Sequence, residues 1–134
     1  MKLIKIVFIA IFAIFITAGC TRGAIPIHNV DNMVNTPMAK KATETQVFNA
    51  IVQAGSSLGW KVTKIKAGLA EARLDIRKHK AVVDIKYDAK TYSITYKSST
   101  NLKYNSSTQT IHPNYNNWII NLDEKIATQV QLIK

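Results

Sequence analysis

The chain has 134 residues, a formal net charge of +10 and a single cysteine. This length suits one domain and little more, and one cysteine excludes a disulfide within the chain, so a hydrophobic core must hold the fold together. The positive charge favours anionic partners without identifying one, and five glycines are too few to favour a glycine-rich loop around a nucleotide.

The first 20 residues have the three-part pattern of a secretory signal. Lys2 and Lys5 make a positive start, residues 6–18 are uncharged and mostly apolar, and the small residue Gly19 precedes Cys20. The apolar run of about 13 residues is shorter than the roughly 20 that a membrane-spanning helix needs. The pattern therefore favours a cleaved leader over a retained membrane anchor.

The stretch Ile16-Thr17-Ala18-Gly19-Cys20 resembles the lipobox of bacterial lipoproteins. It departs from the commonest pattern at one position, where Thr17 stands in place of Leu. The resemblance implies that the thiol of Cys20 takes a diacylglyceryl group, that cleavage removes residues 1–19, and that Cys20 becomes the acylated first residue of the mature chain. Two or three acyl chains hold a protein to a bilayer almost permanently. The alternative is an ordinary signal peptide with a chance cysteine at the cleavage site.

The residue after Cys20 bears on the expected location. In the enteric type of lipoprotein sorting an Asp at this position favours retention in the inner membrane, and this chain has Thr21 there. The resemblance therefore implies a lipid-anchored protein of the outer membrane, facing the periplasm, in an organism with two membranes.

Residues 20–42 are expected to form the lipidated N-terminus and a tether. Prolines and asparagines interrupt this stretch, and neither a helical nor an alternating period persists in it. A flexible stretch of about 20 residues typically reaches about 25 Å, which would hold a domain clear of the lipid surface. Four apolar residues leave open that part of the stretch packs on the domain. They are Ile25, Ile27, Val30 and Met33.

Residues 43–134 are predicted to form a single α+β domain. Thr43 and Gln46 form a capping box at the start of an amphipathic helix. Four strands joined by short turns follow at about residues 60–66, 69–77, 81–87 and 92–97. A polar loop over residues 98–112 then leads to a second amphipathic helix that begins near Pro113.

These elements predict a two-layer α+β sandwich. It consists of an antiparallel meander of about four strands, with the N-terminal and the C-terminal helix packed on one face and water on the other. The predicted core residues are Val47, Ile51, Leu58, Trp60, Leu74, Ile76, Val83, Ile85, Ile94, Ile119, Leu122 and Ile126.

The sequence contains no known catalytic or phosphate-binding motif. None of the three histidines lies at metal-ligand spacing from another histidine, a cysteine or a carboxylate, so neither a metal nor another cofactor is expected. Acidic and basic residues alternate on the predicted open face of the sheet. That alternation favours ion pairs between strands over nucleic-acid binding.

The most unusual composition lies between residues 98 and 118, where hydroxyls, amides and aromatic rings gather around one loop and one helix start. The candidate binding residues are Ser98, Asn101, Tyr104, His112 and Tyr115. Such groups could line a groove for a sugar, a peptide or a lipid head group. The alternative, which the residue types favour, is that they shape the loop, cap the helix and enter the core.

The sequence therefore predicts a membrane-anchored envelope lipoprotein that acts as a non-enzymatic binding or structural module. Its partners would be membrane lipid, through the acylated Cys20, and an envelope protein or an anionic envelope component. The alternative is a small envelope hydrolase or transferase that uses His112 with a nearby Ser or Tyr.

Overall fold

The computed structural model describes residues 23–37 and 41–134, so the predicted signal peptide and Cys20 lie outside the described residues. The elements are, in chain order, β1 (Ile25–Pro26), β2 (Val30–Val34), α1 (Glu44–Ser57), β3 (Trp60–Lys66), β4 (Leu69–Ile76), β5 (His79–Tyr87), β6 (Thr91–Thr100), β7 (Thr110–Ile111) and α2 (Pro113–Gln131). Over the described ranges, no helix combines the length and the hydropathy needed to cross a membrane.

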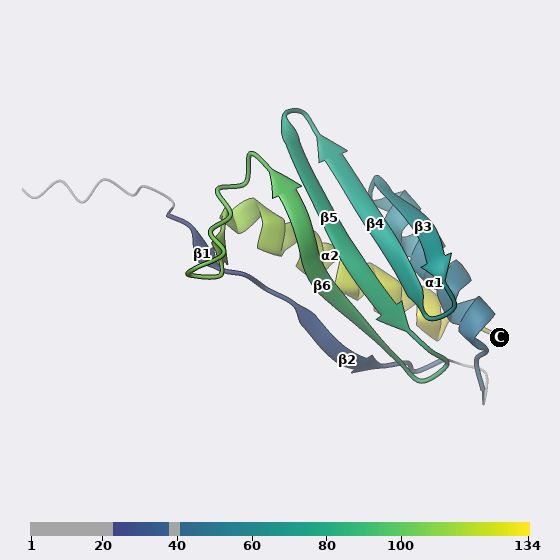
Figure 1. Cartoon of the computed structure of the whole chain (residues 1–134). Helices are drawn as coiled ribbons and strands as arrows, with labels where there is room; N and C mark the ends of the chain where they lie inside the picture. The colour runs from purple at the N-terminus through teal and green to yellow at the C-terminus, as the bar shows by residue number, and fades with distance from the viewer. Residues whose placement is uncertain (1–22, 38–40) are drawn as a thin grey trace, which may run out of the picture.

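Five strands form one antiparallel sheet in the order β2-β6-β5-β4-β3. The two helices pack against each other and against the sheet, and Figure 1 shows both of them on the same side of it. Strands β3 to β6 are the predicted meander, which confirms the α+β class. The sheet has five strands and not four because β2 adds to the free edge of β6, and β1 pairs separately with β7.

The N-terminal part of the described chain belongs to the fold, which corrects the tether expected over residues 20–42. β1 pairs with β7 through Ile25 and Ile111, and β2 pairs with β6 through Val30 and Ile94. Val30 is buried, and Ile27 packs partly buried against the core. Val30 and Ile27 therefore cover the rim of the core, where their burial is favourable, whereas Ile25, Met33 and Val34 stay exposed.

Asn116, in the first turns of α2, holds this segment in place. Its side-chain amide donates to the carbonyl oxygen of Pro26 at 2.8 Å, and its Oδ1 accepts from the N–H of His28 at 2.9 Å. Asn116 is only 9% exposed, so water competes little for either bond. The backbone N–H of Ile27 also donates to the carbonyl oxygen of Gln109 at 2.9 Å. The chain is therefore fixed to the domain from β1 onward.

Capping residues set both ends of α1. The Oγ1 of Thr43 accepts from the N–H of Gln46 at 3.2 Å, and the Oε1 of Gln46 accepts from the N–H of Thr43 at 2.9 Å, which confirms the predicted capping box. Gly59 follows the helix with φ +86°, a left-handed conformation that costs glycine little. The chain then reverses, and Trp60 begins β3.

The core lies between the helices and the covered face of the sheet, and all but two of the predicted core residues are buried in it. Leu58 is 37% exposed, because it is the C-cap of α1 and lies beyond the last regular turn of the helix. Ile76 is partly buried, because it stands at the end of β4.

Both edge strands of the sheet carry features that discourage pairing with another chain. β2 has a register shift, and Asn32 within it adopts a left-handed conformation at φ 50°. β3 has a second register shift, beside which Ile65 is 53% exposed. β3 also carries three exposed lysines, Lys61, Lys64 and Lys66. Irregular register and lysines are the usual protection of sheet edges.

Gly55 lets α1 approach β3 closely. A Cβ at this buried position would lie 2.6 Å from Cγ2 of Val62 and 3.4 Å from Cβ of Trp60. The first distance is far shorter than the 3.5–4.0 Å at which carbon atoms attract one another. Glycine is therefore needed here for close packing and not for its backbone conformation.

We expect Gly55→Ala to lower the free energy of unfolding by about 1–3 kcal/mol, because overpacking outweighs the gain of roughly 1 kcal/mol in helix propensity. Chemical denaturation of the variant measures this loss. Val62→Ala removes the contacting methyl groups, so Gly55→Ala should cost much less in a Val62→Ala background. Equal losses in the two backgrounds would contradict the packing explanation.

Candidate functional site

The five candidate binding residues lie at one end of the molecule, where β6 ends, β7 pairs with β1 and α2 begins (Figure 1). The turn between β4 and β5 reaches the same end, since Lys80 lies opposite Thr100 at the end of β6. We call this region the β1 end, made of residues 25–28, 77–80 and 98–116. The C-terminus lies at the opposite end of α2 (Figure 1).

Asn101 links two loops of the β1 end. Its side-chain amide donates to the carbonyl oxygen of Lys78 at 2.8 Å, and its own carbonyl oxygen accepts from Nδ1 of His79 at 2.8 Å. Its φ of 58° is left-handed, a conformation that asparagine tolerates better than most residues. The polar groups of Asn101 therefore hold the β4–β5 turn against the end of β6.

His112 is the N-cap of α2. Its Nδ1 accepts from the N–H of Asn114 at 3.1 Å, and its backbone N–H donates to the carbonyl oxygen of Leu102 at 2.8 Å. Within the described part of the chain, no hydrogen bond joins the His112 side chain to a serine, a tyrosine or a carboxylate. The hydrolase interpretation needs such a pair and gains no support from this geometry.

Tyr104 and Tyr115 belong to a cluster of three rings centred on Tyr96 of β6. The ring of Tyr104 stacks on Tyr96 with centroids 4.1 Å apart, and Tyr115 meets Tyr96 edge-on at 5.6 Å. Tyr115 is fully buried, and its hydroxyl finds no hydrogen-bond partner among the described residues. Burial raises the pKa of Tyr115, so its hydroxyl stays protonated and does not serve as a base near neutral pH.

Ser98 is exposed on β6, opposite Val82 of β5. The structure thus brings the five residues to one end of the domain, but four of them have structural roles there. Asn101 and His112 bind backbone groups, while Tyr104 and Tyr115 pack against Tyr96. This arrangement agrees with the structural alternative that the sequence analysis favoured.

Four cations also lie at the β1 end, and no local pattern in the sequence groups them. Arg77 and Lys78 form the turn after β4, Lys80 follows in β5, and Lys103 follows β6. Among the described residues, no carboxylate lies within 4.0 Å of any of the four. Lys78 and Lys80 are two residues apart in sequence, and the hydrogen bond of Asn101 to Lys78 joins the β4–β5 turn to the segment that carries Lys103.

Asp75 is the carboxylate that faces this group, since it lies opposite Lys80 in the β4–β5 ladder. Its oxygen lies 2.7 Å from Nε of Arg73, and this hydrogen bond lowers the pKa of Asp75. Asp75 is therefore ionised and neutralises Arg73, which leaves the four cations in excess at the β1 end.

Two of these cations occupy unusual backbone conformations. Arg77 has φ 54° and Lys103 has φ 52°, both in the left-handed region. Such conformations cost a residue with a Cβ roughly 1–2 kcal/mol, a cost that glycine avoids. Strained backbone often accompanies functional sites, so the use of charged residues at these two positions points to a role for their charge.

The open face of the sheet carries charges that neutralise one another. Nζ of Lys97 lies 2.7 Å from Oε2 of Glu71 and 3.7 Å from Oδ1 of Asp84. The hydrogen bond with Glu71 raises the pKa of Lys97. The predicted ion pairs between strands are confirmed for these residues.

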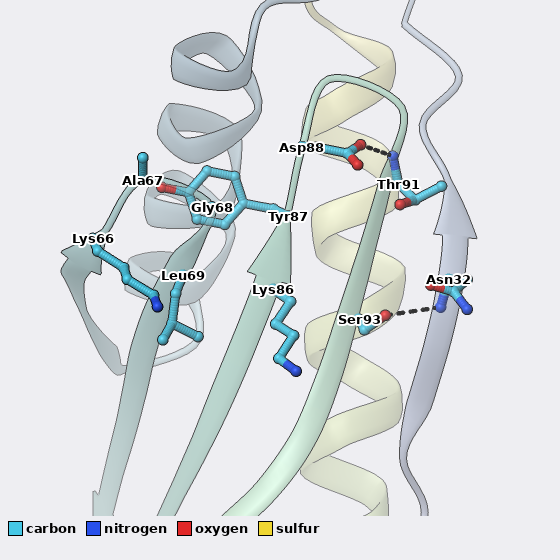
Figure 2. A pocket seen from close by; sticks show the side chains of 10 residues that line it. All are labelled: Asn32, Lys66, Ala67, Gly68, Leu69, Lys86, Tyr87, Asp88, Thr91 and Ser93. Atoms are coloured by element: carbon cyan, nitrogen blue, oxygen red, sulfur yellow. Dashed lines mark hydrogen bonds between the residues drawn. The ribbon is translucent and has the colours of Figure 1, made fainter.

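A pocket of ≈ 360 Å³ lies at the opposite end of the sheet, between the β3–β4 turn, the end of β5 and the start of β6 (Figure 2). Its polar groups serve the fold. Asp88 accepts from the N–H of Thr91 at 2.7 Å, and Ser93 accepts from a backbone N–H of β2 at 2.9 Å. These bonds leave Lys66 and Lys86 as the charged groups available to a ligand, and two surface lysines do not define one.

No group of three metal-ligating side chains forms within residues 23–37 and 41–134. No protein-family model, curated protein sequence or solved structure matches this chain. What the protein does must therefore be inferred from its own residues.

The unpartnered hydroxyl of Tyr115 gives a stability prediction. Tyr115→Phe should raise the free energy of unfolding by up to about 1 kcal/mol, because it removes a buried polar group that makes no hydrogen bond. Tyr92→Phe is the matched control, since the hydroxyl of Tyr92 donates to Oδ1 of Asp123 at 2.6 Å. That control should lose about 1–2 kcal/mol. Urea denaturation measures both, and a loss of stability in Tyr115→Phe would show that its hydroxyl has a partner.

The two cations with left-handed backbone conformations give a second stability prediction. Arg77→Gly and Lys103→Gly should each raise the free energy of unfolding by about 0.5–1 kcal/mol, because glycine relieves the backbone strain at a small entropic cost. Thermal unfolding followed by circular dichroism tests this. Arg77→Ala removes the same charge but keeps the Cβ, so it should bring no such gain. If alanine stabilised as much as glycine, charge repulsion and not backbone strain would be the cause.

Proposed function

We propose that this protein is a lipid-anchored envelope lipoprotein whose two-layer α+β domain acts by binding and catalyses no reaction. The observation that carries the proposal is the position of Cys20. This residue ends a lipobox-like leader, and it lies only five residues before Ile25, the first residue of β1. A covalent lipid at Cys20 would thus be attached almost directly to a folded domain.

The short connection supports a role at the bilayer surface. Five residues span at most roughly 17 Å when fully extended. The predicted tether of residues 20–42 would reach further, but β7 and Asn116 bind the chain from Ile25 onward. A domain held this close meets components of the membrane surface and not components far from it.

The roles of the polar side chains support binding over catalysis. His79 donates to the carbonyl oxygen of Asn101, and His112 caps α2. Catalysis would require a nucleophile and a base in mutual contact, whereas binding requires only a charged or shaped surface. The β1 end, with its excess of cations, offers such a surface. An anionic envelope component is accordingly the partner class that we favour.

Thr21 after the modified cysteine supports the outer membrane as the location in an organism with two membranes. The domain would then face the periplasm. This placement follows from the sorting rule of the lipoproteins that the leader resembles.

The lipid anchor is tested on the protein purified from its native membranes. We expect mass spectrometry to find a mature chain that begins at Cys20 and carries a diacylglyceryl group, with or without a further acyl chain. Cys20→Ala should lack this lipid mass. Because the lipid contributes about 0.8 kcal/mol for each buried methylene, the native protein should remain in the membrane after a high-salt wash.

Thr17→Leu is a matched control, because it moves the leader toward the commonest lipobox and should leave the modification unchanged. A mature chain that begins at another residue, or one with an unmodified Cys20 thiol in the aqueous fraction, would overturn the proposal.

A further inference from the structure

We propose that the β1 end of the domain faces the membrane that holds Cys20, and that Arg77, Lys78, Lys80 and Lys103 contact anionic phospholipid head groups of that membrane. This inference rests on the lipid anchor proposed above. It adds an orientation, a contact surface and a ligand class to that anchor.

A continuous path of hydrogen bonds connects β1 with the cations. Ile25 lies opposite Ile111 in the β1–β7 pair, and the next residue, His112, donates its N–H to the carbonyl oxygen of Leu102. Asn101, beside Leu102, is bonded to Lys78. Neighbouring strands lie about 5 Å apart, so these steps place the β4–β5 turn roughly 15–20 Å from Ile25.

The length of the anchor makes the β1 end the part of the domain nearest to the lipid. The acylated residue can lie no more than roughly 17 Å from Ile25. The helix α2 has 19 residues and rises about 1.5 Å per residue. Its C-terminal end therefore lies roughly 28 Å from its first turn, which is part of the β1 end. The pocket end of the sheet and the C-terminus are therefore directed away from the bilayer when the cations touch it.

The charge of the β1 end suits this orientation but does not by itself select it. The β1 end has four cations without an ion-pair partner among the described residues, and Asp75, which lies opposite Lys80, is bonded to Arg73. The opposite end presents Asp88 in the β5–β6 turn together with Lys66, Lys86 and Lys90, which also lack an ion-pair partner in the described part of the chain, so the position of the anchor selects the β1 end. An anionic leaflet attracts a nearby lysine or arginine with about 1 kcal/mol, which corresponds to about a fivefold preference for each cation.

An aromatic side chain beside the β1 end, Trp118 of α2, also suits the head-group region. Trp118 is partly buried, and its ring lies 6.4 Å from that of His79, the residue between two of the cations. Tryptophan is favoured where one side of the ring is apolar and the other is wet, as at a membrane interface. The β1 end therefore offers a polar aromatic contact in addition to charge.

The chain permits a clean test, because the lipid occupies the thiol of its one cysteine and an introduced cysteine is then the sole reactive thiol. The lipidated mature protein is placed in vesicles of phosphatidylcholine with or without phosphatidylglycerol. A fluorophore is attached through Ser106→Cys at the β1 end or through Ala89→Cys in the β5–β6 turn. A nitroxide on the lipid head groups quenches a fluorophore that lies near the membrane.

We expect the label at position 106 to be quenched several-fold more than the label at position 89, and most strongly in the anionic vesicles. In anionic vesicles the double variant Arg77→Gly/Lys103→Gly should weaken the orientational equilibrium up to about 25-fold, at about fivefold for each cation, so that the two labels are quenched almost equally. Glycine fits the backbone of both positions, so the domain stays folded. The matched control Lys66→Gln/Lys86→Gln removes the same charge at the opposite end and should preserve the preference.

Equal quenching of the two labels on a lipidated protein would overturn the orientation and leave the anchor intact. Loss of the preference in the Lys66→Gln/Lys86→Gln control, but not in the glycine variant, would also overturn it and would assign the contact to the lysine-bearing side of the sheet. An unmodified Cys20 on a protein that does not stay with the vesicles would overturn the anchor and this inference together.

Discussion

The two hydrogen bonds of Asn116 decide where the folded domain begins. They fix the chain at Pro26 and His28 on the first turns of α2, beside the pairing of β1 with β7. Without them, a segment rich in proline and asparagine would have little to hold it, since two residues of strand are marginal by themselves. The consequence reaches beyond stability, because it turns a long tether into a connection of a few residues.

A short connection between a lipid anchor and a domain restricts the orientation of the domain, whereas a long connection does not. A flexible tether lets every face of a domain meet the membrane in turn, whereas a short one restricts which face does so. Under the lipid anchor proposed above, the restricted face is the β1 end, which carries Arg77, Lys78, Lys80 and Lys103. The proposals of a lipid anchor and of a head-group contact thus depend on the same few hydrogen bonds.

Local patterns were sufficient to predict α1, the meander β3–β6 and α2, because caps, turn residues and alternating side chains are each encoded within a few neighbouring residues. β1 and β2 escaped prediction because their partners, β7 and β6, are distant in sequence, the nearest pair being Val34 and Thr91. The candidate site shows the same limit. The role of His112 as a helix cap could be predicted from the residues around it. The position of the Lys103 segment next to the β4–β5 turn depends on the hydrogen bond between Asn101 and Lys78, which lie on different hairpins.

The lysines and the irregular register at the two sheet edges acquire a further importance under the proposed lipid anchor. Confinement to a surface raises the local concentration of identical molecules and lines them up side by side, which is the geometry in which open edges join. A row of like charges on β3 and the distorted backbone around Asn32 oppose that joining. At high density on a leaflet the domains would then stay monomeric instead of associating edge to edge into an extended sheet.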